Sequence, residues 1–277
     1  MSDTRTAAAF ASSWNRIGTV YTREQYLEWI APLRPEDIAG RDVLELGFGN
    51  GSLLVHTGDL GPQRLAGVEL GDTVEQTRRH LQDLPAGMVD LHRGDLTTAE
   101  LGEFDVVYCI GVLHHLTNPR AGFDAVVRHT RPGGRFHCWV YAHEGNAIVR
   151  WIVDPIRRVT SHLPWWLTKY GIALPLVVPY YLWARAARHF PKVLRRLPLG
   201  EYTLWISSAP FRFFHHVAFD QLVTPQTIYL RRGEIEEWLR DPRADASSTY
   251  VIFRNGNSWK FGGRKGSTAK FRGRRGE

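Results

Sequence analysis

Short apolar runs alternate with amphipathic segments between residues 42 and 141. Five of the apolar runs are bounded by Gly and Asp and are typical of strands buried on both faces. They are Asp42–Leu46, Arg64–Leu70, Val89–Arg93, Phe104–Ile110 and Arg135–Tyr141. The segments between them predict helices over Gly51–Gly58, Thr73–Leu81 and Pro119–Arg131. This alternation predicts a parallel α/β sheet, with the loops after the strands along one edge, where ligands bind.

The alternation stops after the fifth predicted strand. The next predicted elements are a helix over Gly233–Arg240 and two strands, Ser248–Arg254 and Ser258–Gly263. An Asn-Gly pair at 255–256 is a strong hairpin signal, so an antiparallel pair should close one edge of the sheet. The intervening block, His143–Leu230, is rich in Trp, Tyr and Phe. We expect it to form an α-rich lid inserted into the sheet domain.

A glycine-rich turn follows the first predicted strand. Gly47, Gly49 and Gly51 give the spacing G-x-G-x-G, and Glu45 lies two residues before the first glycine. Glycines allow positive φ and let a ligand lie close to the backbone. The dinucleotide pattern G-x-G-x-x-G is not matched, and a carboxylate here would repel a pyrophosphate. Glu45 instead suits the ammonium group of an amino-acid cofactor, directly or through water.

Acidic residues also end the next two predicted strands. Glu69 lies 20 residues after Gly49, the offset at which an acid reaches ribose hydroxyls in nucleotide-binding βαβ units. Asp95 could accept a hydrogen bond from an adenine amino group while Leu96 covers the ring. The glycine turn and the two acids, on three successive strand ends, together predict a cofactor with a nucleoside part.

The stretch from Asp42 to Tyr141 resembles the core of class I methyltransferases, which use S-adenosylmethionine (SAM). Val112–Leu116 and Arg131–Arg135 are similar to that family's segments around its fourth and fifth strands. The resemblance implies a Rossmann-like, mostly parallel seven-stranded sheet with an antiparallel edge hairpin, SAM as cofactor, and methyltransferase activity. It also implies that one set of residues lines the cofactor site: Glu45, Gly47, Gly49, Glu69, Asp95, Leu96 and Ile110.

On this interpretation the chain has four parts. Residues 1–142 form the SAM-binding core, 143–230 a lid that sets substrate specificity, 231–264 a helix and hairpin that complete the core, and 265–277 a basic tail. Within the lid, Ser161–Gly200 has no acidic residue and mixes Lys and Arg with aromatic residues. We expect this segment to determine the acceptor.

A base is needed only if the acceptor must lose a proton, because SAM is already activated and the protein mainly aligns the nucleophile. Polar side chains follow the fourth and fifth predicted strands, and a second polar cluster in the lid includes His215, His216 and Asp220. We expect both groups to approach the cleft at the strand ends. The candidate catalytic residues are His115, His143, Glu144 and His216. No H-E-x-x-H or C-x-x-C spacing occurs, so no metal site is expected.

The net charge of +7 is unevenly distributed. Lys260–Glu277 holds seven Lys or Arg against one acid, and Glu144–Gly200 holds nine against two, which leaves the rest of the chain acidic. A small-molecule or lipid-like acceptor, including an anionic one, fits this pattern. A tRNA or other nucleic-acid methyltransferase and a non-catalytic SAM-binding partner subunit are the alternatives.

The lid composition itself leaves three interpretations open. Its aromatic residues can form the core of a helical cap, line an apolar acceptor pocket with a basic rim, or rest on a membrane surface. Tyr170–Ala184 is uncharged but spans only 15 residues with two prolines, whereas a bilayer span needs about 20. Cys109 and Cys138 lie in strand-like runs and are expected to be buried free thiols, which suits the cytoplasm.

Overall fold

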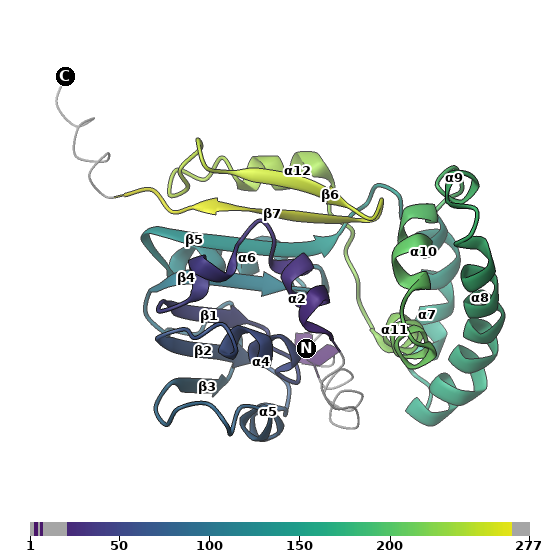
Figure 1. The fold of residues 1–277 in the computed structure, drawn as a ribbon, viewed down its shortest axis with the longest axis horizontal. Helices are drawn as coiled ribbons and strands as arrows, with labels where there is room; N and C mark the ends of the chain where they lie inside the picture. Colours follow the sequence, from purple (N-terminus) through teal and green to yellow (C-terminus); the bar gives the residue numbers. More distant parts are fainter. Residues whose placement is uncertain (1–2, 5, 8–20, 268–277) are drawn as a thin grey trace.

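The computed structural model describes residues 3–4, 6–7 and 21–267. A seven-stranded sheet runs through the core in the order β3-β2-β1-β4-β5-β7-β6 (Figure 1). Strands β1 to β5 are parallel, and β7 pairs antiparallel with both β5 and β6. The strands are β1 Asp42–Leu46, β2 Arg64–Glu69, β3 Val89–Arg93, β4 Phe104–Ile110, β5 Thr130–Tyr141, β6 Tyr250–Arg254 and β7 Ser258–Arg264.

Helices cover both faces of the sheet. Apolar side chains of α6 and α12 pack on one face, and those of α2, α3 and α4 pack on the other. A 3₁₀ turn, η1, follows β4, and α5 follows β2. These elements are α2 Arg23–Ile30, α3 Pro35–Ile38, α4 Ser52–Gly58, α5 Val74–His80, η1 Leu113–His115, α6 Pro119–His129 and α12 Arg232–Trp238.

The predicted fold class is confirmed, and three of the seven strands have the predicted bounds. The Asn-Gly hairpin is also confirmed: Asn255 and Gly256 have φ of 50° and 66°, the two positive values that a tight two-residue turn requires. Strand β5 begins five residues earlier than predicted, at Thr130, because Phe104 pairs with Thr130 before the register shifts. Cys109 and Cys138 are buried and free, as expected.

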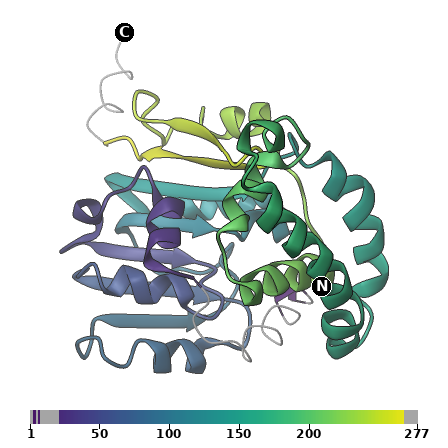
Figure 2. The same cartoon turned by 45° about the vertical axis from the view of Figure 1, so that its right-hand side comes forward.

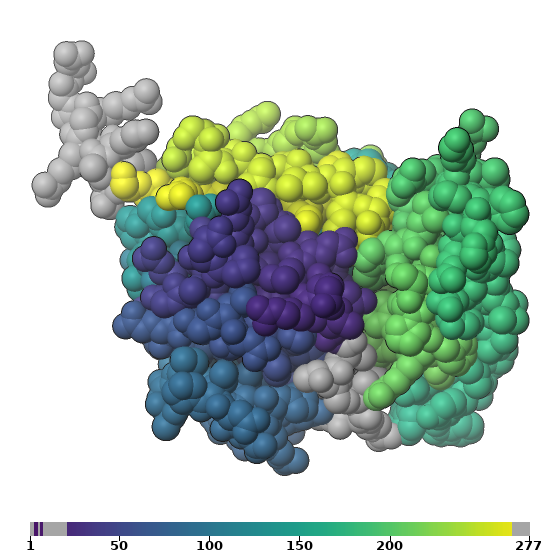
Figure 3. Space-filling view, viewed as in Figure 1, coloured from purple at the N-terminus to yellow at the C-terminus, as the bar shows by residue number. Residues whose placement is uncertain are grey.

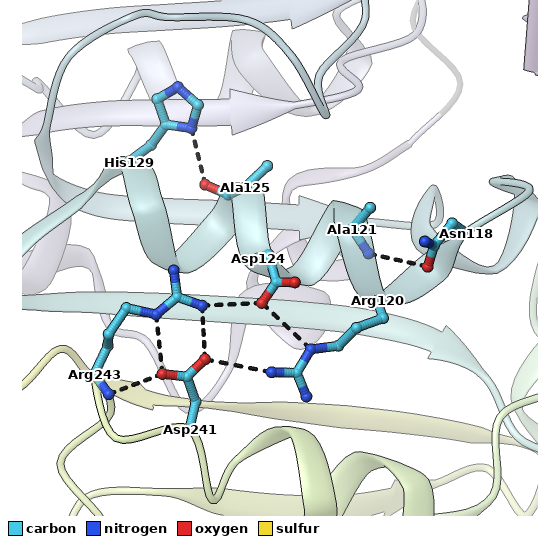
Figure 4. Close-up of polar contacts among 8 residues, drawn as sticks. All are labelled: Asn118, Arg120, Ala121, Asp124, Ala125, His129, Asp241 and Arg243. Carbon is cyan, nitrogen blue, oxygen red and sulfur yellow. Dashed lines mark hydrogen bonds and ion pairs between the residues drawn. The ribbon is translucent and has the colours of Figure 1, made fainter.

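The C-terminal part is attached to α6 by four charged side chains (Figure 4). Arg243 Nη2 lies 2.6 Å from Asp241 Oδ2 and 2.9 Å from Asp124 Oδ1, and Arg120 Nε donates to the same Asp124 oxygen. The Asp241 side chain is 4% exposed. Its hydrogen bond with Arg243 holds the pKa of Asp241 below the ordinary value for aspartate. This ionised pair fixes the loop after α12 to α6.

The block between β5 and α12 is helical, as predicted, and forms a lid beside the sheet edge (Figures 1 and 2). Helices α10 and α11 form its inner layer, on which α7, α8 and the π-helical turn η3 pack from outside. The lid elements are η2 Val149–Val153, α7 Asp154–Thr160, η3 Leu167–Ala173, α8 Leu174–Ala187, α9 Pro191–Leu194, α10 Gly200–Ser207 and α11 Phe211–Val223.

Glu28 on α2 connects the lid to the core. Its carboxylate accepts hydrogen bonds from Trp205 Nε1 on α10, at 3.0 Å, and from Arg254 Nε on β6, at 3.0 Å. The Glu28 carbonyl accepts from Lys260 Nζ on β7 at 2.8 Å. Figure 3 shows the corresponding surfaces meeting, with the green lid against the purple N-terminal helix and the yellow hairpin. These hydrogen bonds of Glu28 hold α10 of the lid beside α2 and the hairpin.

Candidate functional site

A cavity of about 240 Å³ lies between the carboxyl ends of the strands and the inner layer of the lid. The ends of four strands supply one half of its wall, and helices α2, α10 and α11 with the hairpin supply much of the other half. All seven residues assigned to the cofactor from the sequence line this cavity. They are Glu45, Gly47, Gly49, Glu69, Asp95, Leu96 and Ile110.

The glycine turn after β1 has the left-handed backbone that its spacing predicts. Gly47, Gly49 and Gly51 have φ of 80°, 56° and 77°. A Cβ on Gly47 would lie 2.5 Å from Cγ2 of Val112, which also lines the cavity. Both the backbone conformation and the close approach therefore require glycine at this position.

Glu45 is a buried carboxylate at the cavity wall. It is 1% exposed and accepts a hydrogen bond from the Tyr108 hydroxyl at 3.0 Å. The Tyr108 hydroxyl is also hydrogen-bonded to the Thr57 hydroxyl, which is hydrogen-bonded to that of Tyr26. A chain of three hydroxyl groups therefore lies behind the carboxylate. Burial raises the pKa of Glu45 to about 8. Among the described residues Glu45 makes no ion pair, and a cationic ligand in the cavity would supply the missing charge.

Two further carboxylates are held at the ends of β2 and β3. The Glu69 oxygens accept from the backbone N–H groups of Gly49, at 2.9 Å, and Gly71, at 2.7 Å. Burial still raises the pKa of Glu69 above the ordinary value. Asp95 Oδ1 accepts from the backbone N–H and the hydroxyl of Thr97. These contacts fix both carboxylates beside the cavity, and a carboxylate oxygen with two lone pairs can accept further hydrogen bonds from a ligand.

The other half of the cavity wall is mainly aromatic. Its rings come from α2 or the residues before it, from β5, and from the lid helices α10 and α11. They are Tyr21, Trp29, Trp139, Tyr141, Tyr202, Trp205 and Phe213. This half suits a flat or apolar molecule, since aromatic rings offer large apolar contact area.

Helix α11 contributes one continuous face to this aromatic half. Phe213, Val217, Asp220 and Thr224 line the cavity at helical spacings of four, three and four residues. Gln221, beside Asp220, also lines it and donates from Nε2 to the Tyr141 hydroxyl at 2.7 Å. The lid therefore presents an apolar surface with a carboxylate and an amide at one end.

His115 is the candidate base that lies in the cavity wall. Its Nδ1 is 2.9 Å from the carbonyl oxygen of Gln226. A carbonyl only accepts, so Nδ1 carries the proton of that hydrogen bond and Nε2 is the basic nitrogen of the neutral ring. Burial lowers the pKa of His115 to about 4. His114 packs behind it against Tyr141 and is fully buried.

His143 and Glu144 do not line the described cavity, contrary to the expectation that the loop after β5 would face it. Ala142 pairs with Leu230 in a short bridge, which directs the following residues toward α12. His143 Nε2 lies 3.0 Å from Arg231 Nη2. Glu144 accepts from the backbone N–H of Arg232 and from Trp259 Nε1. These partners attach the loop to the C-terminal part of the core.

The polar cluster predicted in the lid, His215, His216 and Asp220, lies on α11, and its members point to different sides of that helix. Asp220 lines the cavity, whereas His216 is 4% exposed and is not part of the described lining. His216 Nε2 lies 3.2 Å from Asp220 Oδ2, so this histidine contacts a residue that lines the cavity. His215 points to the outer layer, where its Nε2 is 2.8 Å from the carbonyl oxygen of Lys169.

The segment Ser161–Gly200, expected to determine the acceptor, contributes none of the described lining. The lid residues that line the cavity fall between 202 and 227. The reason is the layering: α8 packs on α10 and α11, which separate it from the cavity. The basic aromatic segment therefore lies one layer further out than its composition led us to expect.

Several lining residues lie outside every sequence motif. Tyr21 and Trp29 reach the cavity from just before α2 and from α2, and Arg254 and Asn257 reach it from the hairpin. A capping box between Thr22 and Gln25 marks the start of α2 in the sequence. The position of that helix at the cavity depends on packing between distant segments, which no local pattern encodes.

Two observations on the described part of the chain bear on the remaining expectations. No group of three or more His, Cys, Asp and Glu side chains there is arranged to hold a metal ion. None of the helices described is both long enough and apolar enough to cross a bilayer.

Residues 44–138 match the methyltransferase domain family. A curated relative, the ubiquinone biosynthesis O-methyltransferase of Thiobacillus denitrificans, is 32% identical over 119 residues, which cover 42% of this chain and 48% of the relative. The corresponding protein of Albidiferax ferrireducens is 32% identical over 120 residues, 42% of this chain and 44% of that protein. The chain thus spans about half the length or less of the curated relatives it matches.

Two solved structures match most of the chain. An O-methyltransferase family protein from Burkholderia thailandensis has a TM-score of 0.51 and 16% identity, and the match covers 88% of this chain and 56% of that one. The magnesium protoporphyrin IX methyltransferase from Synechocystis PCC 6803, solved with bound SAH, has a TM-score of 0.50 and 14% identity over 92% of this chain and 93% of that one. At these identities the likeness establishes the fold.

Proposed function

We propose that this chain, whose core belongs to the class I SAM-dependent methyltransferase family, transfers a methyl group from SAM to a small amphiphilic acceptor. The single observation that carries the proposal is the cavity, which joins a carboxylate-lined end to an aromatic end beneath the lid. The domain match over residues 44–138 supports the cofactor. The named activity of the curated relatives supports an oxygen atom as the methylated group.

The residues at the strand ends fit SAM. Glu45 would bind its ammonium group, Glu69 its ribose hydroxyls, and Asp95 with Leu96 its adenine. When bound, SAM supplies a methyl group on a positively charged sulfur, which is already activated for in-line displacement. The protein's contribution is to hold the acceptor oxygen on the line of displacement and to exclude water.

The aromatic end supports a flat or lipid-like acceptor with an anionic group. Arg254 lines this end and is 7% exposed, with its guanidinium 4.9 Å from the Trp205 ring centre and 5.8 Å from that of Trp29. Arg254 pairs with Glu28 and lies close to Lys260, so two cations share one acidic partner here. This excess of positive charge favours a carboxylate or phosphate on the acceptor. The indole N–H groups of Trp29 and Trp139 are buried, without hydrogen-bond partners among the described residues, and would suit acceptor oxygens.

We propose His115 as the base for a hydroxyl acceptor. Its Nδ1–H donates to the Gln226 carbonyl, so the neutral ring carries its basic lone pair on Nε2, the atom that would take the acceptor proton. The lowered pKa keeps the ring neutral at pH 7, the form that can accept a proton. Asp220, which pairs with His216, also lines the acceptor end and is the second candidate base after His115.

The test is a screen of hydroxylated aromatic and quinol-like acids with SAM labelled in the methyl group. We expect label transfer to at least one acidic, apolar acceptor and micromolar SAM binding in calorimetry. His115→Gln should lower kcat by about 100-fold and leave SAM affinity unchanged, because a general base contributes about 10²–10⁴-fold. Asp220→Asn is the matched variant from the lid. Binding of NAD without SAM would contradict the family assignment for the site.

The proposed acceptor also leads us to propose a cytoplasmic enzyme that makes peripheral contact with a membrane through its lid. A lipid-like acceptor resides in the bilayer, and the two buried free thiols suit a reducing compartment.

A further inference from the structure

Exposed apolar side chains are concentrated on one part of the molecule. Among the described residues, sixteen large apolar side chains are exposed, and fourteen of them lie between residues 148 and 197. We call the exposed side chains between residues 148 and 197 the outer face of the lid. Monomeric proteins rarely expose contiguous apolar patches of this kind unless the patch binds something.

Helix α8 carries an uninterrupted apolar stripe on this outer face. Its exposed positions follow helical spacing, whereas Val177 and Ala184 on the opposite side are buried against α10 and α11. The exposed positions are Pro175, Leu176, Val178, Pro179, Leu182, Trp183 and Ala186. Leu182 is 63% exposed and Trp183 is 45% exposed. Figure 2 shows this helix at the front of the lid, away from the sheet.

The segment formed by η2 and α7 carries a second stripe. Trp151 is 76% exposed, Ile152 57% and Val159 63%, and Ile148 and Ile156 are exposed as well. The opposite side of this segment is buried: Arg157 donates to the carbonyl and the side chain of Gln221 on α11. Helices α7 and α8 thus both pack inward on α11 and both present apolar residues outward.

The charge around α8 and α9 is mainly positive. No acidic residue occurs between 161 and 200, whereas Arg188, Lys192, Arg195 and Arg196 follow α8 and are exposed. Arg195 forms an ion pair with Glu201, in which the two side chains are 61% and 50% exposed. Apolar residues with Trp, bordered by Lys and Arg, match the composition of surfaces that rest on anionic bilayers.

We infer that the outer face of the lid is a docking surface for an anionic phospholipid bilayer. Its apolar stripes enter the headgroup boundary, and its cations contact the lipid phosphates. A second copy of the chain fits less well, because two outer faces meeting each other would bring their cations together with no acids between 161 and 200 to neutralise them. The contact is peripheral, because the helices that carry the stripes also pack inward on α10 and α11.

The position of this surface links it to the cavity. Helices α10 and α11 carry the cavity wall on one side and the outer helices on the other. A lipid-like acceptor would therefore leave the bilayer one helix layer away from the aromatic end. This deepens the proposed function for the acceptor, but bilayer binding itself is independent of methyl transfer.

The test is co-sedimentation of the full chain, without SAM, with vesicles of phosphatidylcholine alone and of phosphatidylcholine mixed with phosphatidylglycerol. We expect binding to the mixed vesicles that weakens as salt increases. The double variant Leu182→Glu with Trp151→Glu should bind at least 10-fold more weakly. Ile252→Glu, an exposed apolar position on β6 outside the lid, is the matched control and should bind like the wild type.

Charge is tested separately from apolar contact. Alanine at Arg188, Lys192 and Arg196 together should weaken binding to the mixed vesicles by about 100-fold, from about fivefold for each cation. SAM binding by calorimetry and unchanged circular dichroism verify that each variant is folded. A wild type that stays unbound with both vesicle types overturns the inference. So does a dimer in light scattering that becomes monomeric in the Leu182→Glu, Trp151→Glu variant, because the outer face is then a self-interface.

Discussion

The cofactor end and the acceptor end of the cavity are assembled in different ways. The cofactor end takes its residues from the ends of β1 to β4 and from the loops that follow them, between Glu45 and Val112. The acceptor end combines four distant segments, around residues 21–29, 139–141, 202–227 and 254–257. Local sequence therefore determines the first end, whereas the packing of the lid, α2 and the hairpin determines the second.

The comparison implies that substitutions at the two ends should have separable effects. A change in a strand-end loop should weaken SAM binding directly. A change on the inner layer of the lid should affect the acceptor and leave SAM affinity nearly unchanged, because distant sites without shared partners rarely couple.

The largest effect is expected at the glycine turn. Gly47→Ala places a Cβ 2.5 Å from Val112 Cγ2 and imposes a left-handed backbone on alanine. The turn must then relax away from the cavity, and SAM binding has to restore it. Overpacking of about 1–3 kcal/mol and backbone strain of about 1–2 kcal/mol predict a loss of SAM affinity of 100-fold or more. Isothermal calorimetry measures this loss.

Gly61→Ala is the matched control. Gly61 has φ of 69°, but a Cβ added there would meet no atom within 4 Å, and the residue does not line the described cavity. The substitution should lower the unfolding free energy by about 1 kcal/mol and leave SAM affinity unchanged. Equal losses of SAM affinity in both variants would mean that general destabilisation, and not the turn, explains the result.

The second effect concerns the proton that Glu45 loses when SAM binds. Burial raises its pKa to about 8, so about nine-tenths of the free protein holds Glu45 protonated at pH 7. An ammonium ligand requires the carboxylate, so SAM binding should release close to one proton and strengthen as pH rises from about 6 to 8. Calorimetry in two buffers of different ionisation enthalpy counts the proton.

Glu45→Gln should abolish the proton release and weaken SAM binding by about 10-fold or more, from the loss of a charge-assisted hydrogen bond of about 1.5–3 kcal/mol. The sign for stability is the opposite of that for SAM affinity. The raised pKa of Glu45 stabilises the folded free protein below about pH 4.5, and this contribution is lost as pH rises through 8. Urea unfolding of the variant should lack that decline. Proton release that persists in Glu45→Gln would assign it to another group.

The amino-acid sequence specifies the cofactor end of the cavity more directly than the acceptor end. Glu69 and Asp95 could be placed at the cavity because they directly follow buried strands of one parallel sheet. Trp29 could not, because nothing near α2 in the sequence specifies that its ring packs against Trp139 of β5 and Arg254 of β6. His143 was misplaced because the bridge from Ala142 to Leu230 lies across an 88-residue block. Composition identified the lid as helical and aromatic but not which layer faces the cavity.

The third effect separates the two faces of the lid. Phe213 lines the acceptor end, is 5% exposed and packs edge-on against Tyr21 and Trp205. Phe213→Ala should raise the acceptor KM by about 10-fold, since a ring contributes at least about 1.4 kcal/mol of apolar contact, and should keep SAM affinity within about 2-fold. Steady-state kinetics with the acceptor found in the labelled screen measures it.

Phe190→Ala on the outer face, where the ring is 67% exposed, is the control and should leave the acceptor KM unchanged in detergent-free solution. A Phe→Ala change in a core costs about 3–5 kcal/mol and could unfold the lid. Phe213→Leu retains much of the packing and is the second variant for that case. A similar rise in KM for Phe190→Ala would show that acceptor recognition extends to the outer layer, as the sequence alone suggested.

The smallest effect is expected from the basic tail, which belongs to neither end of the cavity. Residues 268–277 lie outside those that the structure describes, but the contacts that precede them are clear. Lys265 Nζ lies 2.9 Å from Glu103 Oε1, the Lys265 carbonyl accepts from the Gly133 N–H, and the Gly266 N–H donates to the Arg243 carbonyl. A chain ending at Gly266 keeps all three contacts, so its folding should be unchanged and its turnover should stay within about 2-fold of the full chain.

The same truncation tests the nucleic-acid alternative. If the acceptor were RNA, removal of Lys270, Arg272, Arg274 and Arg275 would release up to four phosphate contacts and reduce the salt dependence of binding accordingly. A small-molecule acceptor has no such dependence on the tail, because the described residues that line the cavity all belong to segments that precede the tail. Turnover of the truncated chain across a salt series distinguishes the two. If turnover is lost while SAM affinity is unchanged, the acceptor binds to the basic tail, which would favour a nucleic-acid acceptor.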